Sequence, residues 1–261
     1  SWIRKNKGKK FMKLRGKIAL VTGGARAIGR AVSVKLAREG AQVAFNYYAS
    51  EEQARATMDV IKEAGGEAIA IGGDMTNQED VDRLVAETVA AFGDRIDILV
   101  NVTGGLVARK TLEEADLEFF EFVQKLNFTS AFMATKAVVP YMGDGASIVN
   151  IASQAGRDGG GPGAWAYASS KGAVITFTRG LAKELGPKNI RVNALCPGMI
   201  ATTFHDVFTK DQVRTNVAAA TPLRREGQAS EVADAVAYLA SDESSFLTGV
   251  NLDVNGGLVF S

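Results

Sequence analysis

Tyr167 and Lys171 stand four residues apart in the segment Tyr-Ala-Ser-Ser-Lys. In a helix, this spacing puts the two side chains on one face, one turn from each other. A free tyrosine has a pKa near 10, and roughly 4 kcal/mol of phenolate stabilisation is needed to bring it to neutrality. One cation at about 4 Å, in an effective dielectric near 20, supplies roughly that amount. The pair therefore indicates acid–base chemistry at an oxygen atom, although an amphipathic helix with no catalytic role can carry the same two residues.

Composition narrows the other possibilities. The 261-residue chain has a formal net charge of +1, which gives no indication of a nucleic-acid or anionic-membrane partner. With a single histidine, His205, the chain has no multi-histidine metal site, and we predict no metal. The single cysteine, Cys196, permits no intrachain disulfide and fits a reducing, cytoplasmic setting. No apolar run reaches the length of a membrane span, so we expect no membrane partner.

The N-terminal segment differs from the rest of the chain. Residues 1–17 hold eight Lys or Arg residues and no acid, and the apolar run that follows is too short for a signal peptide. We interpret residues 1–12 as a disordered basic tail or an artificial extension, and residues 13–261 as one domain.

Apolar runs alternate with helical patterns along the whole domain, as expected for a parallel sheet covered on both faces. The sequence predicts a single Rossmann-type, doubly wound α/β domain with about seven strands in the order 3-2-1-4-5-6-7. We expect strands at 17–22, 41–45, 67–71, 96–101, 147–151, 191–196 and 250–254. Helices are expected after the first glycine-rich turn and at 51–64, 78–92, 113–141, 167–185, 209–219 and 230–240.

A glycine-rich turn, Thr-Gly-Gly-Ala-Arg-Ala-Ile-Gly at residues 22–29, joins the first strand to the first helix. Glycine lets the backbone turn tightly and approach a pyrophosphate, and the helix N-terminus attracts the negative charge. The position of the turn within a strand–turn–helix unit favours dinucleotide binding over a plain connection.

Residues 16–257 resemble a classical short-chain dehydrogenase/reductase, and in motif style the chain is similar to carbonyl reductases of the 3-oxoacyl-carrier-protein reductase type. The family's nucleotide motif, Thr-Gly-x-x-x-Gly-x-Gly, is matched at Thr22, Gly23 and Gly29, but Ala27 replaces its middle glycine. The family's Asn-Asn-Ala-Gly sequence is represented by Asn101-Val102-Thr103-Gly104.

The resemblance also implies a catalytic tetrad, whose members correspond to Asn127, Ser153, Tyr167 and Lys171. In the family, the serine fixes the substrate oxygen, the tyrosine exchanges a proton with it, the lysine lowers the tyrosine pKa and binds the nicotinamide ribose, and the asparagine holds a relay water. From the sequence itself, Ser153 closes a strand at its carboxyl end, where ligands bind in this architecture, and Asn127 interrupts a helical pattern.

Further residues are expected to contact the cofactor because they match family positions or lie at strand ends. The full expected set is Gly23, Arg26, Ala27, Ile28, Gly29, Asn46, Tyr47, Asp74, Met75, Asn101, Gly104, Tyr167, Lys171, Pro197, Gly198, Ile200 and Thr202.

The choice of cofactor depends on the end of the second strand. An acid there binds the ribose hydroxyls of NAD and repels a 2′-phosphate. This chain has Phe45-Asn46-Tyr47-Tyr48 and no acid before Glu51. Arg26, in the glycine-rich turn, is either a 2′-phosphate ligand or a solvated cation. We expect NADP(H) to be favoured over NAD(H).

The substrate is less constrained by the sequence. The expected substrate residues are Ser153, Gln154, Arg157, Trp165 and Tyr167, with Arg157 equally compatible with a substrate anion and with solvent. The loop from Gln154 to Trp165 is rich in glycine and is expected to be mobile. Residues 141–147, which precede the fifth strand, carry an acid and no base to dock an acidic carrier protein. We therefore favour a small polar ketone or aldehyde, such as a carboxylated sugar-derived keto-acid.

Two alternatives stay open: a 3-oxoacyl-[acyl-carrier-protein] reductase, and a non-catalytic nucleotide-binding sensor on the same fold. Sensors of this kind usually lose the tyrosine or the lysine, whereas this chain keeps both. The resemblance further implies a homotetramer, and the apolar C-terminal end at residues 257–261 is consistent with burial at an interface.

Overall fold

The computed structural model describes residues 12–202, 207 and 209–261. His205 and nearly all of the expected basic tail lie outside these residues.

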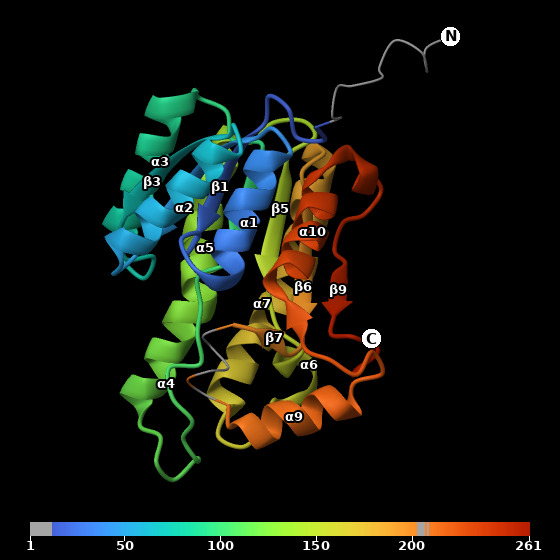
Figure 1. Ribbon diagram of the computed structural model, residues 1–261. Coiled ribbons are helices and arrows are strands. Elements are labelled where there is room, and N and C mark those ends of the chain that lie inside the picture. Colours follow the sequence, from blue (N-terminus) through green and yellow to red (C-terminus); the bar gives the residue numbers. More distant parts are fainter. Residues whose placement is uncertain (1–11, 203–206, 208) are drawn as a thin grey trace.

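A seven-stranded parallel sheet forms the centre of the fold, and its order β3-β2-β1-β4-β5-β6-β9 confirms the expected doubly wound topology (Figure 1). The label β9 marks the seventh strand because two short strands, β7 (Ile200–Ala201) and β8 (Gly227–Gln228), pair with each other outside the main sheet. The main strands are β1 (Ile18–Thr22), β2 (Gln42–Tyr47), β3 (Glu67–Gly72), β4 (Ile98–Asn101), β5 (Ser147–Ile151), β6 (Arg191–Pro197) and β9 (Asn251–Val254).

Helices cover both faces of the sheet and, among the described residues, enclose two large apolar cores and a smaller cluster between α7 and β6. One core packs α1 (Ala27–Arg38), α2 (Glu51–Glu63) and α10 (Ala229–Ala240) against the sheet. The other packs α3 (Gln78–Phe92), α5 (Ser130–Val138) and the end of α7 (Trp165–Leu185). Strands β1, β5 and β6 are buried along their whole length, which explains their continuous apolar sequences.

The remaining helices gather beyond the carboxyl ends of the strands, at the bottom of Figure 1. They are α4 (Leu117–Gln124), α6 (Ala155–Asp158) and α9 (Asp211–Ala220). In this architecture ligands bind at that end of the sheet.

The expected helix over 113–141 is divided in the structure. It consists of α4, a π-helical segment (Lys125–Thr129), α5 and a short 3₁₀ turn (Val139–Tyr141). Asn127 lies inside the π-helical segment, so the interruption expected from its sequence position is real. Segments of this kind are rare and often mark functional sites.

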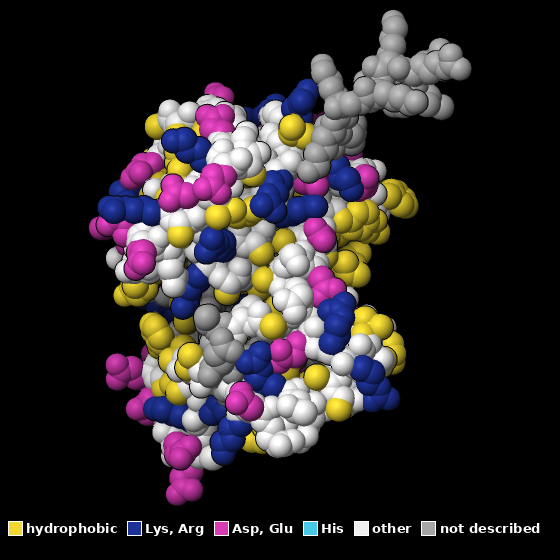
Figure 2. Space-filling view, viewed as in Figure 1, with side chains coloured by type: hydrophobic (Ala, Val, Ile, Leu, Met, Phe, Trp, Pro, Cys, Tyr) yellow, Lys and Arg dark blue, Asp and Glu magenta, His cyan; other side chains and the backbone are white. Residues whose placement is uncertain are grey.

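The surface carries mixed charge. Figure 2 shows Lys and Arg interspersed with Asp and Glu on the face it presents, without a large patch of one sign. Within the described part of the chain, no helix is both long and apolar enough to cross a membrane.

Ala27, which replaces the family's middle glycine, adopts a left-handed backbone with φ of 46°. In a residue with a Cβ atom, this conformation destabilises the folded state by about 1–2 kcal/mol. Glycine avoids that strain, but its greater freedom in the unfolded chain lowers the free energy of unfolding by about 0.5–1 kcal/mol. The alanine therefore strains the turn without changing its path.

Replacing Ala27 with glycine is expected to leave the free energy of unfolding unchanged or to raise it by up to about 1 kcal/mol, because the relieved strain offsets the entropy loss. The matched control is Ala31→Gly, one turn along α1, which should lose about 1 kcal/mol or more. Urea unfolding of both variants measures the difference. Equal losses in the two variants would show that Ala27 is not strained.

Candidate active site

Helix α7 positions the two residues whose spacing suggested acid–base chemistry. Tyr167 is half-buried. Lys171, one turn further along the helix, is only 4% exposed. The Lys171 Nζ atom donates a 2.8 Å hydrogen bond to the carbonyl oxygen of Ile151 and lies 5.8 Å from the centre of the Tyr167 ring. The amine and the phenol therefore share one environment.

Ser153 joins this pair from the carboxyl end of β5. Its hydroxyl is hydrogen-bonded to the Tyr167 side chain and also accepts a 3.1 Å hydrogen bond from the backbone N–H of Ala155. Short helix α6 follows and packs closely on α7, because a Cβ atom on Gly156 would lie 2.7 Å from the carbonyl carbon of Lys171. The glycine lets Ser153 lie beside the turn of α7 that carries the tyrosine.

Asn127 reaches the site from the π-helical segment and is 1% exposed. Its Oδ1 atom accepts from the N–H of Gly105 at 2.9 Å, and its Nδ2 atom donates to the carbonyl oxygens of Gly105 and Val123, each at 2.9 Å. A Cβ atom on Gly104 would lie 2.6 Å from Asn127 Oδ1 and 3.1 Å from Lys171 Nζ. Asn127 thus fixes the chain after β4 directly against the lysine.

Burial is the largest cause of the pKa shifts of Tyr167 and Lys171 on α7. It lowers the pKa of Lys171 to about 8. Burial also raises the pKa of Tyr167, and the hydrogen bond with Ser153 acts in the opposite direction. The pKa of Tyr167 is therefore shifted in the direction opposite to the one expected from the nearby Lys171 ammonium, because burial outweighs the hydrogen bond with Ser153.

The glycine-rich turn has the shape that a pyrophosphate site requires. A Cβ atom on Gly29 would lie 1.9 Å from the carbonyl oxygen of Gly23, and Gly23 itself has φ of 62°. The turn leads into the N-terminus of α1, which has no acidic residue in its first turn.

Hydrogen bonds from three different elements hold this turn. The Oδ1 atom of Asn46, at the end of β2, accepts from the N–H of Gly23 at 2.9 Å. Ser33 on α1 donates to the carbonyl oxygen of Gly24 at 2.9 Å, and Thr57 on α2 donates to that of Ala25 at 3.0 Å. Ser33 and Thr57 are not among the residues predicted for the site, although polar residues on the buried faces of amphipathic helices are a signal for such contacts.

The Nδ2 atom of Asn46 donates two hydrogen bonds within the fold, to the carbonyl oxygens of Tyr47 at 3.1 Å and Gly73 at 2.8 Å. Because both amide protons are donated within the fold, the structural role of Asn46 is to hold the turn. Tyr47 next to it is half-buried, and Tyr48 is 74% exposed.

The described residues fit a nicotinamide dinucleotide. Gly23 and Gly29 leave no room for side chains at the turn, and Gly104, which is exposed, borders Lys171 so closely that a Cβ atom would lie 3.1 Å from the lysine Nζ atom. Arg26 is exposed at the N-cap of α1, and its guanidinium has no hydrogen bond or ion pair to any described residue. The Oγ1 atom of Thr103, between these two regions, is buried without a hydrogen-bond partner among the described residues.

Other expected cofactor residues lie at the same end of the sheet. Asp74 follows β3, and its carboxylate accepts from the N–H and the hydroxyl of Thr76, both at 2.8 Å. The Met75 side chain is in the core. Asn101 bonds Thr135 at 3.1 Å and Asn150 at 2.9 Å, which ties β4 to α5 and β5.

At the end of β6, the carbonyl oxygen of Pro197 accepts from the N–H of Gln154 at 2.9 Å, so this strand end lies beside the serine. Gly198 and Ile200 follow, and the hydroxyl of Thr202 donates to the carbonyl oxygen of Ile200 at 3.3 Å.

Two expected substrate residues have partners within the fold. The guanidinium of Arg157 pairs with Asp253 at 2.8 Å and donates to the carbonyl oxygen of Asn251 at 2.6 Å. Its charge is already balanced, which removes the solvated alternative and argues against a substrate anion. Trp165 donates to the carbonyl oxygen of Lys110 at 3.0 Å and stacks on Phe120.

The glycine-rich loop that was expected to be mobile is bonded at several points. It begins with α6 and is fastened to the segment after β4: the N–H of Lys110 bonds the carbonyl oxygen of Gly163 at 3.2 Å, and Arg109 bonds that of Pro162 at 2.9 Å.

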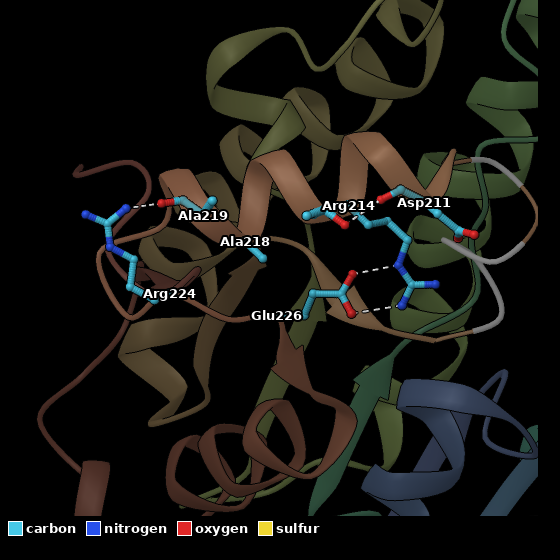
Figure 3. Close-up of a pocket in the computed structure, with 7 residues that line it drawn as sticks. Asp211, Arg214, Ala218, Ala219, Arg224 and Glu226 are labelled. Carbon is cyan, nitrogen blue, oxygen red and sulfur yellow. Dashed lines mark hydrogen bonds and ion pairs between the residues drawn. The ribbon is translucent and has the colours of Figure 1, made fainter.

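A separate hollow lies beside α9 and includes none of the expected site residues (Figure 3). Arg214 points across it to Glu226, and two hydrogen bonds of 2.6 and 2.8 Å join them. The central charges of this hollow therefore neutralise each other.

Comparison with known proteins identifies the family. The family model described as enoyl-(acyl carrier protein) reductase matches residues 23–259. A relative from Arabidopsis thaliana, NADPH-dependent aldehyde reductase 1, chloroplastic, is 40% identical over 95% of this chain and 88% of its own. A 3-oxoacyl-[acyl-carrier-protein] reductase from Synechocystis is 39% identical over 94% of this chain and 98% of its own.

The chain belongs to the short-chain dehydrogenase/reductase family. Among solved structures, a short-chain dehydrogenase/reductase from Serratia marcescens is 35% identical, with a TM-score of 0.89 over 94% of this chain and 99% of the other. An NADH-dependent reductase responsible for alginate metabolism is 34% identical, with a TM-score of 0.87 over 96% of this chain and 100% of the other. As a family member, the protein is an oxidoreductase that uses a nicotinamide cofactor.

The buried lysine gives stability a specific pH dependence. Between a folded pKa of about 8 and the ordinary value of 10.5, the unfolded chain binds the Lys171 proton and the folded chain does not. The free energy of unfolding should therefore rise with pH through this window, by up to about 3 kcal/mol from this group. Above pH 10 the raised pKa of Tyr167 acts in the opposite direction.

Lys171→Met removes the group and should flatten this rise. Denaturant unfolding of both proteins at pH 8, 9 and 10 gives the difference between the two curves. Parallel curves would mean that Lys171 keeps an ordinary pKa in the folded protein.

Proposed function

We propose that the protein is an NADP(H)-preferring carbonyl reductase that acts on a small polar ketone or aldehyde. The observation that carries the proposal is the contact of Ser153 with Tyr167 beside the buried Lys171 amine, which the exposed Gly104 borders. When bound, the nicotinamide supplies the hydride in reduction or accepts it in oxidation.

Each residue then has a defined task. The hydroxyls of Ser153 and Tyr167 hold the substrate oxygen, and Tyr167 gives it a proton as negative charge develops there. With a pKa of about 8, Lys171 can carry or release a proton near neutrality, so it supports reprotonation of the phenol. Asn127 holds Gly105, which keeps the backbone beside the lysine in place.

The preference for NADP(H) rests on the end of β2 and on Arg26. Asn46, Tyr47 and Tyr48 provide no carboxylate there, and the first acid, Glu51, pairs with Arg55 at 2.7 Å. Exposed Arg26 at the N-cap of α1 is free to bind a 2′-phosphate. The relative named as an NADPH-dependent aldehyde reductase agrees with this assignment, whereas the structural neighbour named as NADH-dependent does not.

The substrate class is argued from the surroundings of the site. Arg157, the cation nearest in sequence to Ser153, is paired with Asp253, so recognition has to rely on hydrogen-bonding groups more than on a strong charge. Before β5, Asp144 bonds Asn189, and residues 141–147 supply no base for an acidic carrier. A small polar carbonyl compound fits this setting.

A 3-oxoacyl-[acyl-carrier-protein] reductase is the second candidate, favoured by the family description and by the Synechocystis relative. The sensor alternative is weaker because the serine, tyrosine and lysine are brought together.

A homotetramer agrees with the exposed Phe122 on α4 and Phe132 on α5. Light scattering after gel filtration measures the oligomeric state. Cytoplasmic location stays a prediction.

Tyr167→Phe is expected to keep cofactor affinity within about twofold and to lower turnover by at least about a hundredfold, since it removes only the proton donor. Absorbance at 340 nm with aldehydes, keto-acids and a 3-oxoacyl thioester gives the activity of both proteins. Substantial residual turnover would exclude Tyr167 as the acid. Far faster turnover of the thioester than of any keto-acid would select the second candidate.

Arg26→Ala should raise the KM for NADPH by roughly tenfold or more and leave that for NADH nearly unchanged, because a charge-assisted contact to phosphate is lost. Arg38→Ala, at the far end of α1, is the matched control and should affect neither. Steady-state kinetics with both cofactors provides the comparison. Equal changes for NADPH and NADH would remove Arg26 from the phosphate site.

A further inference from the structure

Thr103 carries a buried polar atom without a hydrogen-bond partner among the described residues, as do Asn101 and Gln154. Thr103 lies two residues after the end of β4 and is half-buried, but its Oγ1 atom is closed from solvent and has no hydrogen-bond partner among the described residues. Its backbone is held in place, because its N–H donates to the Thr22 hydroxyl at 3.2 Å. The backbone is therefore fixed, and only the side-chain hydroxyl lacks a partner.

The position of Thr103 links the two halves of the site. A Cβ atom on Gly23 would lie 3.2 Å from the Cα, N and Oγ1 atoms of Thr103, so the residue packs directly against the glycine-rich turn. The next residue, Gly104, is exposed and borders Lys171 Nζ and Asn127 Oδ1. A dinucleotide that reaches from the turn to Lys171 has to pass Thr103.

A buried hydroxyl without a partner is unfavourable, and an alanine or valine would avoid this cost. The family sequence that this segment resembles has alanine here, so the hydroxyl is a feature of this chain. Rotation about the Cα–Cβ bond exchanges the hydroxyl with the methyl group between staggered positions. A ligand acceptor beside the partly exposed side chain can therefore receive its proton.

We infer that the Thr103 hydroxyl donates a hydrogen bond to an oxygen acceptor in the pyrophosphate–ribose section of the dinucleotide and thereby adds to cofactor affinity. The inference rests on the cofactor use assigned above. Because NADPH and NADH share this section, Thr103 contributes equally to both, whereas Arg26 distinguishes them.

Three variants test this contact. Thr103→Val removes the hydroxyl and keeps the shape, Thr103→Ser keeps the hydroxyl, and Thr88→Val is the control. Thr88 is a fully buried threonine on α3, and its hydroxyl donates to the carbonyl oxygen of Leu84 at 2.7 Å. The measurements are the dissociation constants of NADPH and NADH by titration calorimetry and the melting temperature of the ligand-free proteins.

Thr103→Val should weaken the binding of both cofactors by about three- to tenfold, as expected for the loss of one hydrogen bond. Its ligand-free melting temperature should equal or exceed that of the wild type, because no internal bond is lost. Thr103→Ser should bind within about twofold of the wild type, and Thr88→Val should bind as the wild type does.

Wild-type affinity in Thr103→Val would overturn this inference alone. A lower ligand-free melting temperature in that variant would also overturn it, since the hydroxyl would then be bonded within the protein. Should Thr103→Val not fold, the cofactor affinities of Thr103→Ser, which keeps a hydroxyl, and Thr103→Ala, which lacks it, give the same comparison. A wild-type protein that binds neither cofactor would overturn the proposed function and this inference together.

Discussion

The site depends on the burial of one ammonium group. Lys171 is almost completely enclosed, and among the described residues the only hydrogen bond of its Nζ atom goes to the carbonyl oxygen of Ile151. Burying a cation with so little compensation is costly, and the lowered pKa of Lys171 expresses that cost. Such an arrangement persists only where the surrounding structure enforces it and function benefits from a lysine that loses its proton easily.

Glycines and one local distortion make the enclosure possible. Gly156 lets α6 contact the backbone of α7 at Lys171, and Gly104 lets the chain after β4 pass beside the amine. The π-helical segment turns Asn127 inward, where its amide bonds both backbone groups of Gly105. The distortion in the helix is therefore coupled to the position of the strand end, and both are coupled to the lysine.

The sequence predicted the strands, because continuous apolar runs and glycine-rich turns are local signals, and the alternation of strands with helices predicted their doubly wound order. It did not predict the balance of forces on Tyr167. The helical spacing placed the amine near the phenol, but the burial that raises the tyrosine pKa arises from tertiary packing, which local sequence signals do not report. The ion pair of Arg157 was not predicted either, because its partner Asp253 lies on the last strand, far along the chain.

The end of β2 shows how one residue can restrict the role of its neighbours. In members of this fold that bind NAD, an acid at this strand end contacts the ribose. Here Asn46 uses its whole amide to join the glycine-rich turn, its own strand and the end of β3. A carboxylate at that position would face two carbonyl oxygens without a proton to donate, so the neutral amide is required. The proposed preference for NADP(H) therefore depends on residues outside the strand, and the proposal assigns this part to Arg26 at the N-cap of α1.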